Sequence, residues 1–148
     1  MADKRRALIG FAGMTHLGLV SASVCAAKGF LTICYDADMA LIRALRSGSL
    51  HVEEPGLTEL VKSNGPAQSF TSDVSALAEC DLVVHSAAAV SFDSPLDLAV
   101  EINLLGPSRV AAAMAAAREL AADEGRTGPE HLIAISTCYV ASTFQGEA

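Results

Sequence analysis

Five short runs of residues that favour β-strands alternate with longer stretches of helical pattern along this chain of 148 residues. Parallel strands need crossovers of this kind, because the end of one strand and the start of the next lie at opposite edges of the sheet. The runs at 31–35 and 82–84 are continuously apolar, which is typical of strands buried on both faces. The alternation predicts an α/β fold in which a doubly wound parallel sheet of about five strands has helices on both sides.

The expected strands are residues 7–12, 31–35, 69–71, 82–85 and 131–136. The expected helices are residues 15–28, 38–46, 56–62, 74–78 and 96–122. Gly29 should end the first helix as its C-terminal cap, and the Gly106-Pro107 pair should bend the last one. Pro55 should lie in the first turn of the third helix. Because the pattern contains no linker or repeat, we expect residues 1–148 to form a single domain.

Charge and cysteine placement exclude several classes of protein. The net charge is −7 and the only basic cluster is Lys4-Arg5-Arg6, so a nucleic-acid surface is not expected. No apolar run reaches the roughly 18 residues of a membrane span, and MADKRR is not followed by a signal-peptide pattern, so we expect a cytoplasmic protein. The four cysteines form no C-x-x-C pair, which favours reduced, buried thiols and predicts no metal site. They are Cys25, Cys34, Cys80 and Cys138.

The stretch GFAGMTHLG, residues 10–18, joins the first expected strand to the first expected helix. A dinucleotide-binding turn at such a junction lets the backbone approach a pyrophosphate at the helix N-terminus. Gly13 can supply the tight turn and Gly18 the close packing of the helix, but Thr15 replaces the middle glycine of the usual G-x-G-x-x-G pattern. We hypothesise that the Thr15 hydroxyl donates to a phosphate oxygen. The candidate cofactor residues of the turn are Gly13, Met14, Thr15, His16, Leu17 and Gly18.

Asp36 follows the second expected strand, 23 residues after Gly13. A carboxylate at this place can accept hydrogen bonds from the ribose diol of an adenosine and repel a 2′-phosphate. The combination therefore predicts a dinucleotide as the ligand, with NAD favoured over NADP. The alternative is a strand-to-helix corner of purely structural importance, in which His16 is an exposed side chain of the first helical turn.

Residues 1–84 resemble the NAD-binding domain of the UDP-glucose/GDP-mannose dehydrogenase family. The resemblance is carried by GFAGMTHLGLVSASVCAAKGF, CYDADMALIRALRSG, VEEPGLTELV and FTSDVSALAECDLV. It implies a Rossmann domain with strand order 3-2-1-4-5. It also implies that residues 13–18 hold the pyrophosphate of NAD and that Asp36 holds the ribose.

Residues 85–148 resemble a second family, the extended short-chain dehydrogenases/reductases of the fatty acyl-CoA reductase or thioester-reductase branch. The marks are HSAA at 85–88, NLLG at 103–106 and Ser-Thr at 136–137. This resemblance implies that Ala87 and Ala88 lie in a turn beside the cofactor ribose. It also implies that Asn103 holds a backbone kink and a proton-relay water in the helix, and that Thr137 forms a hydrogen bond with a substrate carbonyl. We therefore hypothesise a chimera with a junction near residues 82–86. One family matching residues 70–110 without a break would contradict it.

Neither resemblance brings a complete set of catalytic residues. The sugar-nucleotide dehydrogenases use a cysteine from a later domain, and none of the cysteines here lies in the matching motif. The reductases need a Y-x-x-x-K pair, and Tyr139 has Thr143 four residues on. The sequence therefore favours a module that binds NAD(H) without catalysis.

Two alternatives stay open: a structural chimera with a vestigial pocket, and an oxidoreductase that acts on a sugar nucleotide or an acyl thioester only with a partner. A homo-oligomer, most simply a dimer, is also expected. The fifth strand would be an apolar edge, and the alanine-rich face at 111–117 would allow close approach of another helix.

Overall fold

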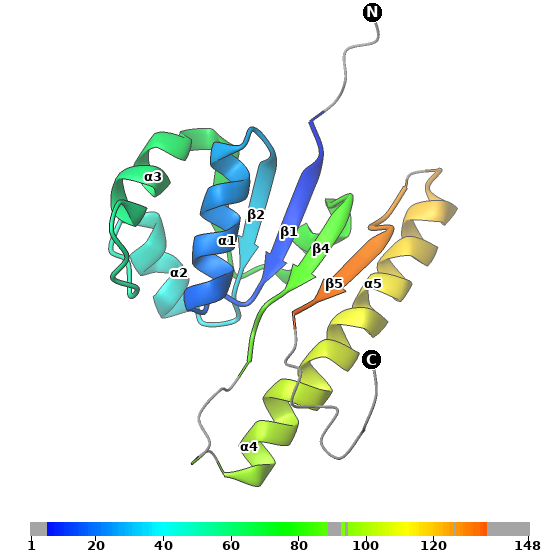
Figure 1. Cartoon of the computed structure of the whole chain (residues 1–148). Helices are drawn as coiled ribbons and strands as arrows, with labels where there is room; N and C mark the ends of the chain where they lie inside the picture. Colours follow the sequence, from blue (N-terminus) through cyan, green and yellow to red (C-terminus); the bar gives the residue numbers. More distant parts are fainter. Residues whose placement is uncertain (1–5, 89–92, 94, 126, 136–148) are drawn as a thin grey trace, which may run out of the picture.

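Five parallel strands form one sheet in the order β3-β2-β1-β4-β5 (Figure 1). The structure, a computed structural model, describes residues 6–88, 93, 95–125 and 127–135. The strands are β1 (Leu8–Ala12), β2 (Leu31–Tyr35), β3 (Gln68–Thr71), β4 (Leu82–His85) and β5 (His131–Ala134). The predicted doubly wound parallel sheet and its strand order are confirmed.

Helices cover both faces of this sheet (Figure 1). One face packs against α1 (His16–Ala27), α2 (Met39–Arg46) and α3 (Leu57–Asn64). The other packs against α5 (Gly106–Asp123) and the 3₁₀ helix η2 (Val74–Glu79). A further 3₁₀ turn, η1 (Gly65–Ala67), connects α3 to β3.

The predicted helix boundaries differ from the observed ones at particular caps. Thr15 is the N-cap of α1 rather than its first residue. Gly56 is the N-cap of α3 in a left-handed conformation, with a φ of 80°, so α3 begins at Leu57 and Pro55 lies outside it. Asp73 caps η2 by accepting a hydrogen bond from the amide of Ser75.

The chain winds outward from β1 in two directions, through β2 to β3 and through β4 to β5. The carboxyl ends of β1 and β4 therefore lie at the point where the strand order reverses. Doubly wound folds bind their ligands at this point. The register pairs Ala12 at the end of β1 with Tyr35 of β2 and with His85 of β4, so three strands end together here.

Three buried polar side chains tie α1, α3 and β3 together. They are Ser23, Asn64 and Gln68, with exposed fractions of 0%, 9% and 7%. The side-chain amide of Asn64 donates to the carbonyl oxygen of Ser23 (3.0 Å) and to Oε1 of Gln68 (2.7 Å). Nε2 of Gln68 donates in turn to Oγ of Ser23 (3.0 Å), which donates to the carbonyl of Leu19 (2.8 Å). The hydrogen-bonding groups of this cluster satisfy one another away from water.

The long helix expected at 96–122 contains a wider turn. It consists of α4 (Leu96–Val100), the π-helical turn η3 (Glu101–Leu105) and α5. The amide of Gly106 donates to the carbonyl of Glu101, five residues earlier. The irregularity thus precedes Gly106-Pro107 instead of falling on it. Because proline lacks an amide and its ring crowds the carbonyl four residues earlier, a wider turn ahead of Pro107 relieves the conflict.

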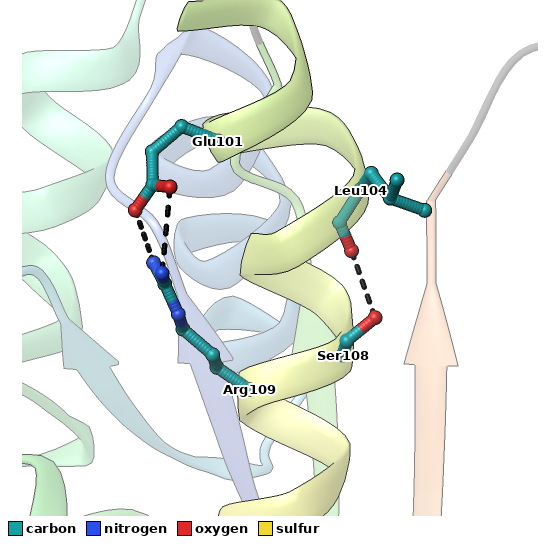
Figure 2. Close-up of polar contacts among 4 residues, drawn as sticks. All are labelled: Glu101, Leu104, Ser108 and Arg109. Atoms are coloured by element: carbon teal, nitrogen blue, oxygen red, sulfur yellow. Dashed lines mark hydrogen bonds and ion pairs between the residues drawn. The ribbon is translucent and has the colours of Figure 1, made fainter. Parts of the chain in front are cut away.

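Two side-chain contacts bridge this turn on the surface (Figure 2). Arg109 donates from both terminal nitrogens to the carboxylate of Glu101, and Oγ of Ser108 donates to the carbonyl of Leu104 (2.8 Å). All of these side chains are exposed, so the contacts add little to stability.

The cysteines of the described residues are shielded from solvent. Cys34 and Cys80 are buried and Cys25 is half-buried, while Cys138 lies outside the described residues. Burial raises the pKa of the Cys34 thiol to about 12, and burial together with Asp81 and Glu79 raises that of Cys80 to about 12. The expectation of buried free thiols holds for this part of the chain.

Cys34 and Cys80 should therefore resist alkylation. At pH 8 we expect iodoacetamide to modify them at least about a hundredfold more slowly in the native protein than in denaturant, because only the thiolate reacts. Peptide mass spectrometry over a time course measures this, with the half-buried Cys25 as the internal comparison. Equal rates in the native and denatured states would contradict the burial of these thiols.

Candidate functional site

The turn between β1 and α1 is fixed by its neighbours at the carboxyl edge of the sheet. The amide of Gly13 donates to the carbonyl of Tyr35 at the end of β2 (2.9 Å). Gly13 has a φ of 97°, a conformation that favours glycine. A Cβ on Gly13 would lie 2.5 Å from the Cβ of Ala87, in the segment after β4. Both the backbone conformation and the available space therefore require glycine at this position.

Gly18 lies where α1 comes closest to the turn. A Cβ there would be 1.9 Å from the carbonyl oxygen of Gly13 and 2.7 Å from Oγ of Ser86. No side chain fits at such distances, so this glycine allows the helix to start directly beside the turn. The prediction that Gly18 permits close packing of the helix is confirmed.

Asp36 is joined to the turn by its carboxylate. Its Oδ2 accepts a hydrogen bond from the amide of Met14 (2.8 Å), and its Oδ1 accepts one from the amide of Asp38 (3.0 Å). Its own amide donates to the carbonyl of Thr71 at the end of β3 (3.2 Å). The acid predicted from sequence spacing is thus held directly beside the glycine-containing turn.

Thr15 has a different bond from the one hypothesised. Its hydroxyl donates to the carbonyl of Ser86 (3.1 Å), and Oγ of Ser86 donates to the carbonyl of Gly13 (3.2 Å). A hydroxyl carries one proton, so in this arrangement Thr15 has none left to donate to a phosphate oxygen. A bond from Thr15 to a phosphate oxygen would therefore require its hydroxyl to turn away from Ser86, and this hypothesis stays a prediction.

The other candidates of the turn differ in what they expose. The Met14 side chain is fully buried, in the core cluster with Phe11 and Leu19, so only its backbone lies at the turn. Leu17 is 46% exposed. Ala88 is exposed beyond Ala87.

Of the two catalytic candidates, Asn103 lies among the described residues and Thr137 does not. Asn103 is exposed within η3. Thr137 falls outside the described residues, so its predicted role stays a prediction.

His16, the first residue of α1, contacts a residue that the sequence did not single out. Its Nε2 lies 2.7 Å from Oε1 of Glu54, which comes from the loop between α2 and α3. Both side chains are largely exposed, 62% for His16 and 42% for Glu54. The loop containing the Glu54-Pro55-Gly56-Leu57 motif therefore reaches the N-terminus of α1.

Two residues at the end of β4 also carry weight that sequence patterns did not reveal. Ser86 accepts or donates three of the bonds around the turn, including one from its amide to the carbonyl of Ala12 (3.1 Å). His85 is 4% exposed, and a Cβ on Gly106 would lie 3.7 Å from its Nε2. In the sequence both residues stand out only as part of HSAA at 85–88, and neither that pattern nor the apolar run before it indicates what their side chains contact.

His85 should make stability depend on pH. Burial lowers its pKa from the ordinary value of 6.5, so the unfolded chain binds a proton at a pH where the folded protein does not. The stabilisation is complete above pH 6.5 and is lost as the pH falls below it. We expect denaturation midpoints to drop between pH 7.5 and 5.5, and His85→Leu to reduce that drop. His131→Gln, at an exposed position of β5, should leave it unchanged. An identical drop in His85→Leu would refute this role.

Within the described ranges, no three His, Cys, Asp or Glu side chains gather in a way that could hold a metal ion. In the same part of the chain, no helix is both long enough and apolar enough to cross a membrane.

Comparisons with known proteins place this arrangement in a family. A model described as the UDP-glucose/GDP-mannose dehydrogenase family, NAD binding domain, matches residues 7–140. The UDP-glucose 6-dehydrogenase TuaD of Bacillus subtilis (strain 168) is 37% identical over 78 residues, which are 51% of this chain and 17% of that protein. The UDP-glucose 6-dehydrogenase of Rhizobium meliloti (strain 1021) is 39% identical over 74 residues, 48% of this chain and 17% of that protein.

A solved structure gives the same picture at the level of the fold. A ternary complex of GDP-mannose dehydrogenase from Pseudomonas aeruginosa superposes with a TM-score of 0.65 and 20% sequence identity, over 91% of this chain and 30% of that one. This likeness supports the Rossmann-type sheet and does not extend to the reaction.

The family match also bears on the expected junction. It extends over residues 70–110 and so includes the expected junction near residues 82–86, which counts against a composition from two families. The resemblance of residues 85–148 to short-chain reductases is not shown by these matches. The chain covers 17% of the length of each curated relative. This chain belongs to the UDP-glucose/GDP-mannose dehydrogenase family and corresponds to its NAD-binding domain.

Proposed function

We propose that this domain binds NAD(H) across the turn between β1 and α1, and binds it in preference to NADP(H). The observation that carries the proposal is the bond from the Met14 amide to the Asp36 carboxylate (2.8 Å), which holds the ribose-binding acid beside the phosphate turn. The cradle formed by Gly13 and Gly18 supports it, since an added Cβ at either position would meet the backbone or side chain of a neighbour.

Each part of the turn has a task in this proposal. The N-terminus of α1 presents free amides and the positive end of its dipole to the pyrophosphate. Asp36 uses one acceptor site on each carboxylate oxygen for Met14 and Asp38, and a carboxylate has about four. The remaining sites can accept the ribose hydroxyls, while the negative charge repels a 2′-phosphate and so selects against NADP.

We further propose that the domain does not oxidise a sugar nucleotide by itself. The family resemblance implies a thiol nucleophile, and a thiol must ionise to react. Burial raises the pKa of Cys25, Cys34 and Cys80, so none of these three presents a thiolate at neutral pH. The names of the curated relatives suggest UDP-glucose as the substrate of a larger protein that contains such a domain.

A second candidate is a domain whose turn is purely structural. It is favoured by the bonds from Thr15 to Ser86 and from Ser86 to Gly13, which fasten the turn to the segment after β4 without any ligand. In that case Gly13 and Gly18 serve packing alone.

A titration with NADH, NAD and NADPH, followed by nicotinamide fluorescence and calorimetry, separates the two candidates. We expect NADH to bind more tightly than NADPH. Asp36→Asn should weaken NADH binding about tenfold, because hydrogen bonds to a charged acceptor are worth more than neutral ones. The same substitution should also bring the dissociation constants of NADH and NADPH closer together. Asp123→Asn, an exposed acid at the end of α5, serves as the control. No binding at millimolar NADH would leave the structural turn as the function.

A further inference from the structure

We propose that Glu54 is an autoinhibitory carboxylate that holds the donor nitrogen of His16 when no cofactor is bound, and that the cofactor's pyrophosphate must displace it. The inference rests on the proposed function, because it concerns the same phosphate turn. It makes Glu54 a residue that sets the affinity of the site without binding the cofactor itself.

The charge of the Glu54 carboxylate fixes the direction of the hydrogen bond. Nε2 of His16 and Oε1 of Glu54 are 2.7 Å apart. An ionised carboxylate can only accept, so the ring nitrogen donates. His16 is the first residue of α1, at the end of the helix where a pyrophosphate lies in the proposed complex. One N–H cannot serve a carboxylate and a phosphate oxygen equally well, so the two acceptors compete for it.

The loop places Glu54 firmly enough to act in this way. The carbonyl of Glu54 accepts a hydrogen bond from the amide of Leu57 (3.1 Å), Gly56 adopts the left-handed conformation, and Leu57 is buried with 4% exposure. The backbone on the carboxyl side of Glu54 is thus anchored in the core, while its side chain is exposed and reaches across to α1.

There is also room for the displaced carboxylate. A cavity of about 480 Å³, open to solvent, lies beside the loop. Its lining residues are Leu50, Val52, Glu53, Glu54, Pro55 and Thr58. Glu54 can therefore turn away from His16 into water without moving Leu57 or the core beneath it.

Charge gives the sign of the effect. The first turn of α1 contains no acidic residue, so Glu54 brings a negative charge from the loop to a helix end that otherwise favours anions. Loss of its charge should weaken the hold on the His16 donor, because a neutral amide oxygen accepts a hydrogen bond less strongly than a carboxylate, and should also lower the repulsion of a phosphate. Because both side chains are largely exposed, water and salt screen the interaction and the effect should be moderate.

The test is a set of NADH dissociation constants for the intact chain and four variants. We expect Glu54→Gln to bind NADH about three- to fivefold more tightly at low salt. His16→Ala should bind it more weakly. Glu54→Gln combined with His16→Ala should lose at least half of the gain, because no donor remains to be freed. Glu53→Gln removes the same charge from the neighbouring residue, for which the structure records no bond to His16, and should change the constant by less than about 1.5-fold.

The outcomes distinguish this inference from the function on which it rests. If the native chain binds NADH and Glu54→Gln is unchanged or weaker, the inference is wrong and the proposed function stands. If Glu53→Gln and Glu54→Gln lower the NADH dissociation constant equally, the change in net charge explains the effect, and the inference is also overturned. If no variant binds NADH at millimolar concentration, both fall. Circular dichroism of each variant checks that these exposed substitutions leave the fold intact.

Discussion

Gly18→Ala is expected to lower the free energy of unfolding by more than about 3 kcal/mol, at the upper end of the usual cost of an overpacked substitution. The added methyl group would lie 1.9 Å from the carbonyl oxygen of Gly13. This oxygen belongs to a backbone whose amide is already bonded to the end of β2, so the turn cannot yield as a flexible side chain would. Either α1 moves away from the sheet or the turn is lost. Urea denaturation followed by circular dichroism measures the change.

Gly106→Ala provides a matched control for that experiment. Gly106 also lies in the first turn of a helix, but it has a helical φ of −55°, and the nearest atom to an added Cβ is 3.7 Å away. Alanine at such a site should be neutral or stabilising by up to about 1 kcal/mol. If the two substitutions had the same effect, the close approach at Gly18 would not be the cause. NADH binding should be lost in Gly18→Ala and retained in Gly106→Ala.

Asn64→Leu is expected to cost about 2 to 4 kcal/mol of stability. It removes the donor that satisfies both the carbonyl of Ser23 and Oε1 of Gln68, and each buried acceptor left without a partner costs about 1 to 3 kcal/mol. Thermal and urea denaturation should show the loss as a lower midpoint. Ser63→Ala is the adjacent control, since that hydroxyl is exposed and bonds only within α3 (2.9 Å to the carbonyl of Leu60). It should change stability by less than about 0.5 kcal/mol.

A double variant separates loss of hydrogen bonding from loss of shape. Asn64→Leu leaves Oε1 of Gln68 without its donor, and the double variant Asn64→Leu with Gln68→Leu removes this acceptor as well. We expect the combined cost to be smaller than the sum of the two single costs, because the residues share one hydrogen-bond cluster. Strict additivity would mean that the cluster does not act as a unit.

The fold was predictable because its signals are periodic and local. Short runs of residues that favour strands identified all five strands, and Gly29 placed the end of α1 to within a residue or two. The cluster of Ser23, Asn64 and Gln68 was not predictable in the same way. Asn64-Gly65-Pro66 is typical of a turn, and nothing local indicates that the asparagine side chain points inward. Its partners come from 41 and 4 residues away, and only the packing of α1 against α3 brings them together.

The candidate site was predicted in outline for a comparable reason. The spacing of Gly13, Gly18 and Asp36 follows from the geometry of a strand-turn-helix unit and its neighbouring strand, so sequence alone indicates it. The partner of Thr15 was missed because Ser86 lies 71 residues further on, and the HSAA pattern at 85–88 does not indicate a contact with the turn.

Some expectations from the sequence stay predictions. The homo-oligomer is one of them, and exposed side chains such as Leu96 (79%) and Leu120 (66%) are compatible with it.

The turn owes its shape to partners that are distant along the chain. Met14 and Asp36 are 22 residues apart, and Gly13 and Ser86 are 73 residues apart. A nascent chain that has emerged only as far as α3 therefore has the glycines and the acid but lacks the segment that closes the turn from the β4 side. The proposed cofactor site is completed in the same step that adds β4 to β1. A dinucleotide bound there would stabilise the pairing of the two halves of the sheet, so that ligand release and separation of β4 from β1 become linked events.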